Sequence, residues 1–165
     1  MAKQERRNSV KIRTEPRAGA TWIALAGNLD EGADFSSVKQ LPGSLVLDLG
    51  EIGRVNSLGV RNWIHFVRDY EAAGAALTFE RCAPMMVQQM SMITNFMGTR
   101  SHVKSLLAPY VCMSCHHELL DLVEIAQGAP IAVQQTRPCP KCNATMELDE
   151  LLETYTKLFQ KPKRA

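Results

Sequence analysis

The sequence predicts an α/β fold, in which a mixed sheet with helices is followed by a small C-terminal zinc-ribbon-like module and a closing helix. Between residues 44 and 111, apolar runs of strand length alternate with segments of helical periodicity, which is typical of crossover connections and largely parallel strands. Two runs near the start of the chain indicate a hairpin, which adds an antiparallel edge. Four of the five cysteines follow Tyr110, where the character of the sequence changes.

Length and composition favour one ordinary domain with a small appendage. The chain has 165 residues, 45% of them hydrophobic, and its net charge of +2 does not by itself indicate nucleic acid. The sequence shows no secretory signal and no apolar run near the roughly 20 residues of a membrane span. We therefore expect a cytoplasmic protein, in which paired cysteines are more typical of metal sites or redox groups than of disulfides.

Basic residues gather at both ends of the chain. We interpret them as solvated ends, with residues 1–8 as a flexible N-terminus; the alternative is a basic arm for RNA or an acidic partner. The residues are Lys3, Arg6, Arg7, Lys11, Arg13 and Arg17 at one end, and Lys161, Lys163 and Arg164 at the other.

The first elements are predicted from alternation and turn signals. Val10–Thr14 and Thr21–Ala26 are expected to be the strands of the hairpin, and residues 27–32 a break. Phe35–Leu41 has the length of a short helix. Ser44–Leu49 is nearly all apolar, as central strands covered on both faces are.

The strongest helix signal follows a loop expected over residues 50–56. Ser57–Ala73 has apolar residues at helical spacing, with Asn56 or Ser57 as its N-cap and Gly74 just after its end.

The rest of the chain adds strand, helix and a final helix. Ala75–Glu80 is predicted as a strand, Pro84–Met97 as a helix and Val103–Val111 as an extended run broken by Pro109. Leu148–Phe159 is expected to form the closing helix. Cys82, at a strand end, is expected to be a small buried hydrophobe.

Two C-x-x-C pairs carry the clearest chemical signal. Cys112 and Cys115 form one pair, Cys139 and Cys142 the other, and residues 116–138 separate them. Two such turns let four thiolates converge on one ion, so this spacing predicts a zinc site. Four thiolates leave no open coordination position, so the zinc is expected to be structural.

The residue after each C-x-x-C pair often needs a positive φ, which Asn143 suits well and His116 tolerates. We interpret His116 and His117 as bystanders of the zinc site. A redox dithiol is a competing interpretation, but a thioredoxin-like pair follows a strand and opens a helix, and neither pair fits that pattern well.

Many zinc ribbons bind nucleic acid, which is the alternative function for this module. The residues between the pairs argue against it, because they include Glu118, Asp121 and Glu124, with Arg137 as the only basic residue and no aromatic residue for base stacking. The module is therefore interpreted as a structural brace or a protein-contact surface.

Residues 9–107 resemble the STAS domain, the fold of bacterial anti-sigma factor antagonists. Four matches carry the resemblance besides the helix Val87–Gly98: Leu25–Asp30 is similar to that family's G-x-L-D segment, Leu45–Leu49 to its central strand, Arg54–Arg61 to its D-S-S-G-L turn, and Gly74–Phe79 to the next glycine and strand. The domain organisation is then 9–107 for the STAS-like domain, 108–146 for the zinc-binding segment and 147–165 for the C-terminal helix and tail.

The resemblance implies a role for Ser57. In that family the first serine of the turn is phosphorylated by a partner that is both a serine kinase and an anti-sigma factor, and phosphorylation breaks the complex. Ser57 has that position, and Arg54 and Arg61 are expected within reach of a phosphate. Asn56 stands where the family has aspartate and Leu58 where it has a second serine, so the alternative is that Ser57 only caps its helix.

The sequence contains no catalytic motif, so a non-enzymatic regulatory protein is expected. The expected partner is a protein, such as an anti-sigma factor or serine kinase, and neither a nucleic acid nor a membrane.

Overall fold

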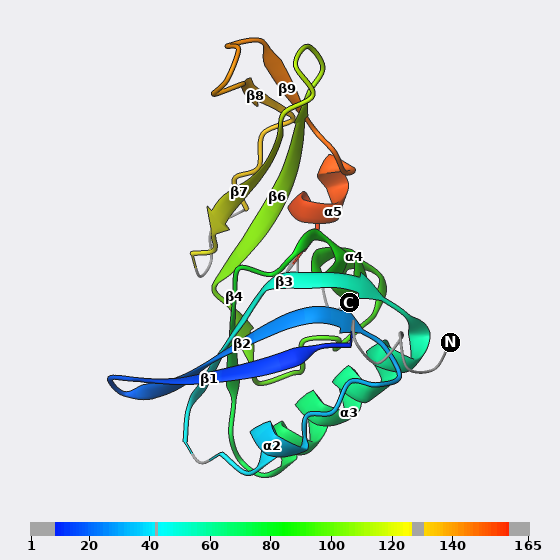
Figure 1. The fold of residues 1–165 in the computed structure, drawn as a ribbon. Coiled ribbons are helices and arrows are strands. Elements are labelled where there is room, and N and C mark those ends of the chain that lie inside the picture. Colours follow the sequence, from blue (N-terminus) through cyan, green and yellow to red (C-terminus); the bar gives the residue numbers. More distant parts are fainter. Residues whose placement is uncertain (1–8, 42, 127–130, 159–165) are drawn as a thin grey trace, which may run out of the picture.

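The computed structural model describes residues 9–41, 43–126 and 131–158, which form two sheets with helices packed around them (Figure 1). The predicted flexible N-terminus, the basic residues of both ends outside Lys11–Arg17, and the end of the closing helix at Phe159 lie outside the described residues. The elements in chain order are β1 Lys11–Arg17, β2 Ala20–Leu29, α2 Ser36–Lys39, β3 Leu45–Val55, α3 Ser57–Ala72, β4 Leu77–Glu80, α4 Pro84–Met92, β5 His102–Val103, β6 Ser105–Cys112, β7 Glu118–Glu124, β8 Thr136–Pro138, β9 Thr145–Leu148 and α5 Leu152–Thr156.

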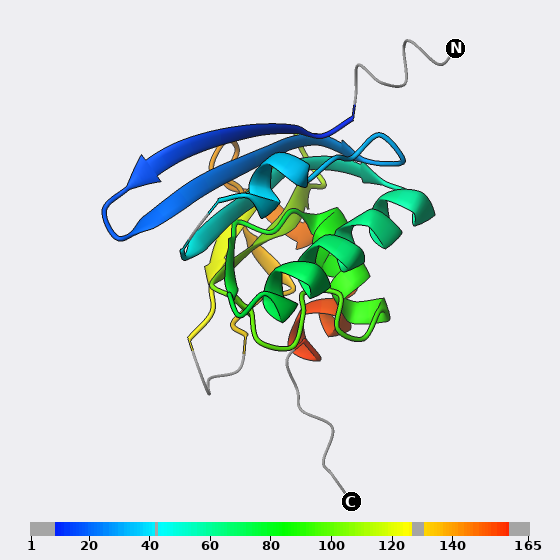
Figure 2. The same cartoon turned by 90° about the horizontal axis from the view of Figure 1, so that it is seen from below.

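The five-stranded sheet has the order β1-β2-β3-β4-β5. β1 and β2 are antiparallel, and the remaining neighbours are parallel, which confirms the predicted mixed sheet with an antiparallel edge. The helices α2 and α3 lie along the same face of this sheet in both views (Figures 1 and 2).

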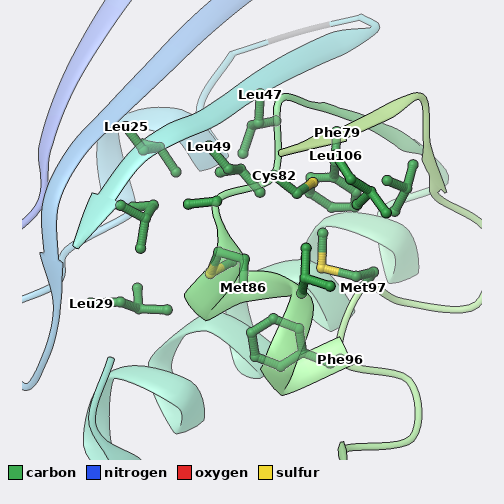
Figure 3. Packing of buried hydrophobic residues seen from close by; sticks show 14 of the residues in the cluster. Leu25, Leu29, Leu47, Leu49, Phe79, Cys82, Met86, Phe96, Met97 and Leu106 are labelled. Carbon is green, nitrogen blue, oxygen red and sulfur yellow. The ribbon is translucent and has the colours of Figure 1, made fainter. Parts of the chain in front are cut away.

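The core of this body forms where the central strands meet the helices. Leu25, Leu47 and Phe79 come from three neighbouring strands and lie near Met86 of α4 (Figure 3). Cys82 is completely buried among them, as predicted, and burial raises the pKa of its thiol far above the usual range. Each large apolar side chain of this core, when fully removed from water, contributes about 1.5–3 kcal/mol to the free energy of folding.

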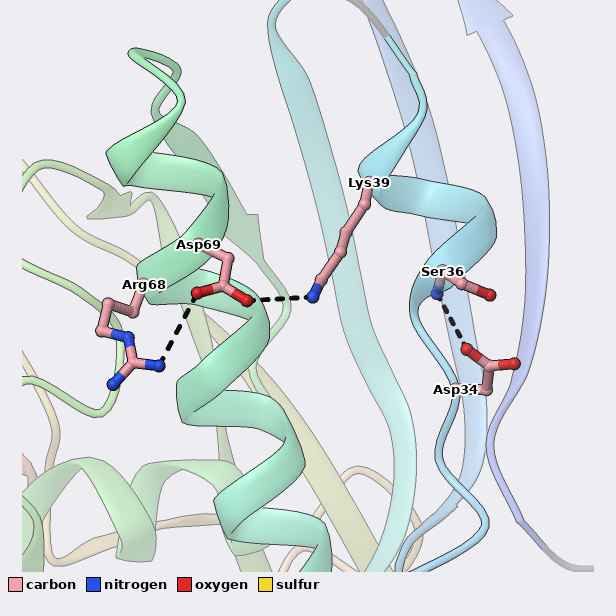
Figure 4. Close-up of polar contacts among 5 residues, drawn as sticks. All are labelled: Asp34, Ser36, Lys39, Arg68 and Asp69. Carbon is pink, nitrogen blue, oxygen red and sulfur yellow. Dashed lines mark hydrogen bonds and ion pairs between the residues drawn. The ribbon is translucent and has the colours of Figure 1, made fainter.

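Helices α2 and α3 are joined by a surface ion pair (Figure 4). Lys39 Nζ lies 3.1 Å from Asp69 Oδ2, and Arg68 approaches the other oxygen of that carboxylate at 3.7 Å. Asp34 accepts the backbone N–H of Ser36 at the start of α2, and this bond lowers the pKa of Asp34. These groups are exposed, so they orient α2 more than they stabilise it.

Two strands of the body are longer than predicted. β2 continues into the expected break at residues 27–32 and ends at Leu29, and β3 continues into the expected loop at residues 50–56 and ends at Val55. Their parallel pairing reaches Leu29 and Val55, and its register shifts between Ala24 and Ala26 and again between Gly27 and Leu29, with one extra residue of β3 at each shift. Glycines at 50 and 53 made this part of β3 resemble a loop in the sequence.

Predicted boundaries were also wrong farther along the chain. α4 ends at Met92 instead of Met97, because Ile93 is extended and Asn95 has a φ of +62°. The run from Val103 divides at Lys104 between β5 and β6, which belong to different sheets, whereas Pro109 lies within β6.

The closing helix is shorter than predicted, and the three strands β7, β8 and β9 were not predicted. α5 spans only Leu152–Thr156 among the described residues, because Leu148 ends β9 by pairing with Tyr110. β7 was not predicted, although its residues alternate between the two faces of a sheet.

The second sheet has the order β7-β6-β9-β8 and is antiparallel throughout. In Figure 1 it extends upward from the body, with α5 beside β6. β6 begins at Ser105, and an isolated bridge joins Leu106 to Cys82 at the end of β4. The hydroxyl of the buried Tyr155 in α5 donates to the carbonyl of Leu107 at 3.0 Å, so the lower end of this sheet shares the core of the body.

Candidate functional site

The four cysteines of the two C-x-x-C pairs lie in the turns of two hairpins at the far end of the four-stranded sheet. Cys112 ends β6 and Cys115 lies in the turn before β7, whereas Cys139 follows β8 and Cys142 lies in the turn before β9. β6 pairs with β9, which brings the two turns together. All four Sγ atoms lie within 4.8 Å of one another, and this cluster can hold a metal ion.

The separations of the sulfur atoms fit a tetrahedral site. Cys112 Sγ lies 3.5 Å from Cys142 Sγ, and Cys115 Sγ lies 3.7 Å from Cys139 Sγ. A tetrahedron of thiolates with metal–sulfur bonds of about 2.3 Å has sulfur–sulfur edges of about 3.8 Å. Both of these contacts join cysteines of different turns, and each turn supplies two of the four sulfurs, so both hairpins are needed for the site.

Each turn has the backbone geometry that directs two sulfurs to one side. The residues after the pairs, His116 and Asn143, have φ values of +60° and +61°, as the sequence predicts. Backbone N–H groups point at the sulfurs: that of Cys115 lies 3.5 Å from Cys112 Sγ, and that of Lys141 lies 3.4 Å from Cys139 Sγ. The side chains of His116 and His117 are not part of the cluster.

The same N–H groups change the acidity of the thiols. The N–H of Cys115 lowers the pKa of Cys112 to about 6, whereas burial opposes the backbone N–H groups of Cys142 and Lys141 that lower the pKa of Cys139. The N–H of His117 favours the thiolate of Cys115, but burial and the three neighbouring sulfurs raise its pKa to about 12. A metal ion bound by four thiolates must therefore displace protons, so its affinity falls as the pH falls.

The geometry of the pairs differs from that of a redox dithiol. Cys112 ends a strand and Cys139 follows one, and a tight turn comes directly after each. Neither pair therefore opens a helix.

The start of α3 is the second predicted site. Asn56 is the N-cap: its backbone is extended, and its Oδ1 accepts the N–H of Gly59 at 2.9 Å. The hypothesis that Ser57 caps the helix is wrong, because Ser57 is already the first helical residue. Its side chain is exposed and makes no hydrogen bond to another described residue.

Gly59 fixes the start of α3 against the end of β2. A Cβ at this position would overlap the carbonyl group of Leu29, so only glycine allows this approach. The N–H of Asn56 donates to the same carbonyl oxygen at 3.1 Å, and its Nδ2 donates to Glu31 Oε2 at 2.9 Å. Ser57 is therefore presented from a backbone held at three points.

The predicted basic neighbours of Ser57 are exposed. The backbone N–H of Arg54 donates to Asn28 Oδ1 at 3.1 Å, but the guanidinium groups of Arg54 and Arg61 make no ion pair with another described residue. Leu58, which the sequence analysis did not count as a contact residue, has half of its surface exposed. Ser57, Leu58 and Arg61 share the exposed first turns of α3.

Comparisons with known proteins add no assignment: no family model matches the chain, and no curated protein matches it. Among the described residues, no helix has both the length and the apolar character needed to cross a membrane.

Proposed function

We propose that this chain is a non-enzymatic bacterial regulatory protein, in which a STAS-like α/β body binds a signalling protein and the four-stranded module is a zinc-stabilised brace. The proposed partner is of the kind that the resemblance to anti-sigma factor antagonists implies, a serine kinase that is also an anti-sigma factor. The exposed surface formed by Arg54, Ser57, Leu58 and Arg61, named here the α3 surface, is the proposed docking site.

The observation that carries this proposal is the state of Ser57. It is exposed, its hydroxyl has no partner among the described residues, and Asn56 performs the capping that would otherwise explain it. A hydroxyl that neither caps nor packs is accessible to a kinase.

The surroundings of Ser57 favour a phosphate chemically. The first turn of α3 leaves backbone N–H groups unpaired at the positive end of a 16-residue helix. Arg54 and Arg61 are exposed and carry positive charge three residues before and four residues after Ser57. A phosphate adds about −1.5 to −2 charge and would cancel most or all of the positive charge that Arg54 and Arg61 give the α3 surface, which provides a physical basis for release of a partner.

Zinc is the proposed ion because four cysteine thiolates in a tetrahedral arrangement are its typical structural site. Four protein ligands leave no position for water or substrate, so the ion is assigned to folding and not to catalysis.

The docking proposal is tested with a partner captured from cells. The tagged full-length chain is expected to co-purify with a protein containing a serine kinase domain, and this complex is expected to be lost in Leu58→Glu and in Ser57→Glu. The matched control is Leu151→Glu, at an exposed leucine before α5. Equal loss of the complex in all three variants, or retention in all three, contradicts the α3 surface.

Phosphorylation and metal are tested together by native and denaturing mass spectrometry of the chain from cells. We expect one zinc ion per chain in the native spectrum, and a phosphate-sized addition that maps to Ser57 after incubation with the captured kinase and ATP. Absence of zinc, with disulfides in its place, contradicts the brace; phosphate only at other serines contradicts the switch.

Nucleic-acid binding is the alternative function, favoured by the exposed Lys11, Arg13 and Arg17 of edge strand β1. Arg17 and Arg13 lie over the ring of Trp22, at 4.4 and 5.7 Å from its centroid, so two of these cations already have a partner. This alternative predicts DNA or RNA affinity that falls steeply with salt. A flat titration at low salt would exclude it.

A further inference from the structure

In the described part of the chain, the two sheets end in four edge strands, β1 and β5 in the body and β7 and β8 in the module. Edge strands can pair with another chain, and proteins limit this with short strands, prolines and charged side chains. β5 has two residues, β8 has three and ends in Pro138, and β1 contains Pro16 with Lys11, Arg13 and Arg17. β7 has seven residues and no proline, and it lies at the outer edge of the module (Figure 1). It is therefore the edge best suited to pair with an added strand.

The exposed face of β7 is apolar in its middle and acidic at both ends. Leu120 and Leu122 are 51% and 49% exposed, and Glu118 and Glu124 occupy the next alternate positions on the same face. The pairing with β6 places Pro109, which is only partly buried, opposite Leu120. Contiguous exposed apolar side chains with a polar rim are typical of protein-binding sites.

The backbone of the same residues is accessible from outside the sheet. The N–H of Ile125, directly after β7, donates to the carbonyl of Lys104 at 2.9 Å. Hydrogen bonds in an antiparallel pair involve every second residue, so the odd-numbered residues of β7 are those that bond to β6. The N–H and C=O groups of Leu120 and Leu122 therefore point away from β6, where an added strand can bond to them.

The charges of this edge decide between a second copy of the chain and a different partner. Neither Glu118 nor Glu124 forms an ion pair with another described residue, and Lys104, near Glu124, bonds to Glu80 at 3.0 Å. Two antiparallel copies of β7 that pair about Asp121 place Glu118 opposite Glu124 at both ends. Like charges directly opposite each other destabilise a strand pair, and a register shifted by two residues places a leucine opposite a glutamate. A second copy therefore fits this edge poorly, whereas a basic strand fits it well.

We propose that β7 binds an extended segment of a partner protein as an added strand. The segment has two apolar side chains at alternate positions, which cover Leu120 and Leu122. At the next alternate position on each side it has a lysine or arginine, which meets Glu118 or Glu124. Backbone hydrogen bonds give such a pairing its affinity, and the side chains on the shared face give it selectivity. This surface lies outside the proposed α3 surface and does not depend on a kinase partner.

Three heptapeptides with blocked ends test the occupant on the full-length chain at low salt. Lys-Thr-Val-Thr-Val-Thr-Lys has the required pattern, and we expect it to shift the backbone amide resonances of Leu120 and Leu122 saturably and to slow their exchange with solvent. Glu-Thr-Val-Thr-Val-Thr-Glu is expected to bind about ten-fold more weakly, because its charges repel those of β7. The lysine peptide with both valines N-methylated keeps its side chains but lacks the two N–H donors that face β7, so we expect no saturable shift.

Three results of the peptide titrations would overturn the proposal. The first is the absence of a saturable shift with the lysine peptide at millimolar concentration. The second is equal binding of the glutamate peptide or of the N-methylated peptide. The third is dimerisation of the chain alone that protects the amides of Leu120 and Leu122, because the edge would then be occupied by a second copy.

Two sets of variants separate binding from folding. Glu118→Lys combined with Glu124→Lys is expected to bind the glutamate peptide more tightly than the lysine peptide, a gain that misfolding cannot produce. Leu120→Thr is expected to weaken binding of the lysine peptide about three- to ten-fold. Leu151→Thr, at an exposed leucine before α5, is the matched control and should leave this affinity unchanged. Continued preference of the double variant for the lysine peptide, or equal effects of the two leucine substitutions, would contradict the site.

Discussion

The two sheets of this protein are stabilised in different ways. In the five-stranded body, Leu47, Trp63 and Phe79 are completely buried between strands and helices. In the four-stranded module, Leu120 and Leu122 of β7 are about half exposed, and the far end buries little besides Cys112, Cys139 and Met146. The far end of the module buries few apolar side chains, so we expect a metal ion bound by the four cysteines to stabilise it.

The two ends of the four-stranded module are held in different ways. Its near end belongs to the body, since Leu106 bridges to Cys82 and Tyr155 reaches Leu107. Its far end is held by the pairing of β6 with β9 and of β8 with β9, and both pairings are short. Loss of the metal is therefore expected to loosen the module from its far end towards α5 and to leave the body folded.

The largest expected effect is that of Cys142→Ser. Cys142 is exposed, so the substitution changes almost no packing and acts through the metal. Structural zinc contributes about 10–16 kcal/mol of apparent binding energy in peptide models, far more than the short strands β8 and β9 can replace. We expect loss of the metal and rapid amide exchange over residues 136–148, which include β8 and β9, with protection retained in β2, β3 and β4.

Two controls define this result. Removal of the metal by a chelator should reproduce the exchange pattern of Cys142→Ser, and Cys82→Ala should destabilise the body without changing the metal content. Equal loss of protection in both sheets after chelation would show that the protein unfolds as one unit. The two sheets would then not be stabilised separately.

The second prediction concerns the body alone. In Gly59→Ala the new methyl group overlaps the carbonyl of Leu29, the last residue of β2. Helix α3 must therefore move away from β2. Overpacking of this kind costs about 3 kcal/mol or more. Urea unfolding followed by the fluorescence of Trp22 and Trp63 should show the loss, while the metal content stays at the wild-type value. A change below about 0.5 kcal/mol, typical of exposed positions, would mean that the approach of α3 to β2 is looser than described.

The third prediction uses a buried carboxylate of the body. Glu71 accepts three backbone N–H groups and two hydroxyls from the segment Thr99–Ser101, at distances of 2.7 to 3.3 Å. Burial alone would raise the pKa of Glu71, but these donors lower it to about 2. A folded-state pKa below the unfolded value of 4.5 stabilises the protein above that value, and this stabilisation is lost as the pH falls from about 4.5 towards 2.

Unfolding measurements from pH 5 to 2 test this contribution of Glu71. The shift corresponds to about 3 kcal/mol, and Glu71→Gln is expected to lack this part of the pH dependence. Glu153→Gln, at an exposed site paired with Lys157, is the control and should retain it. The same acid dependence in wild type and Glu71→Gln would assign it to other carboxylates.

The sequence was informative where the signal is local. The two C-x-x-C turns, the positive φ at His116 and Asn143, and the alternation of strands and helices all depend on neighbouring residues, and the structure agrees with each. The extension of β3 was not predictable in this way, because it depends on pairing with β2 across two register shifts.

The features of the sites that the sequence did not predict also depend on contacts between residues far apart in the chain. Whether Asn56 or Ser57 caps α3 is decided by which side-chain oxygen reaches the N–H of Gly59, and this depends on the anchoring of Asn56 to Leu29. The ion pair of Asp121 with Arg137 joins two edge strands that are not neighbours in the sheet, so spacing along the chain did not indicate it.

The smallest predicted effect distinguishes structure from function at the α3 surface. Asn56→Ala removes the bonds to Gly59 and Glu31 and should cost about 1 kcal/mol of unfolding free energy, as loss of an N-cap does. Ser57→Ala removes an exposed hydroxyl without a described partner and should change the stability by less than about 0.5 kcal/mol. Thermal unfolding of both variants at equal metal content measures the difference. If Ser57→Ala is as stable as the wild type but is no longer phosphorylated by the captured kinase, the hydroxyl serves regulation. If Ser57→Ala is less stable than Asn56→Ala, the Ser57 hydroxyl stabilises the start of the helix. The hydroxyl is then not free for a kinase.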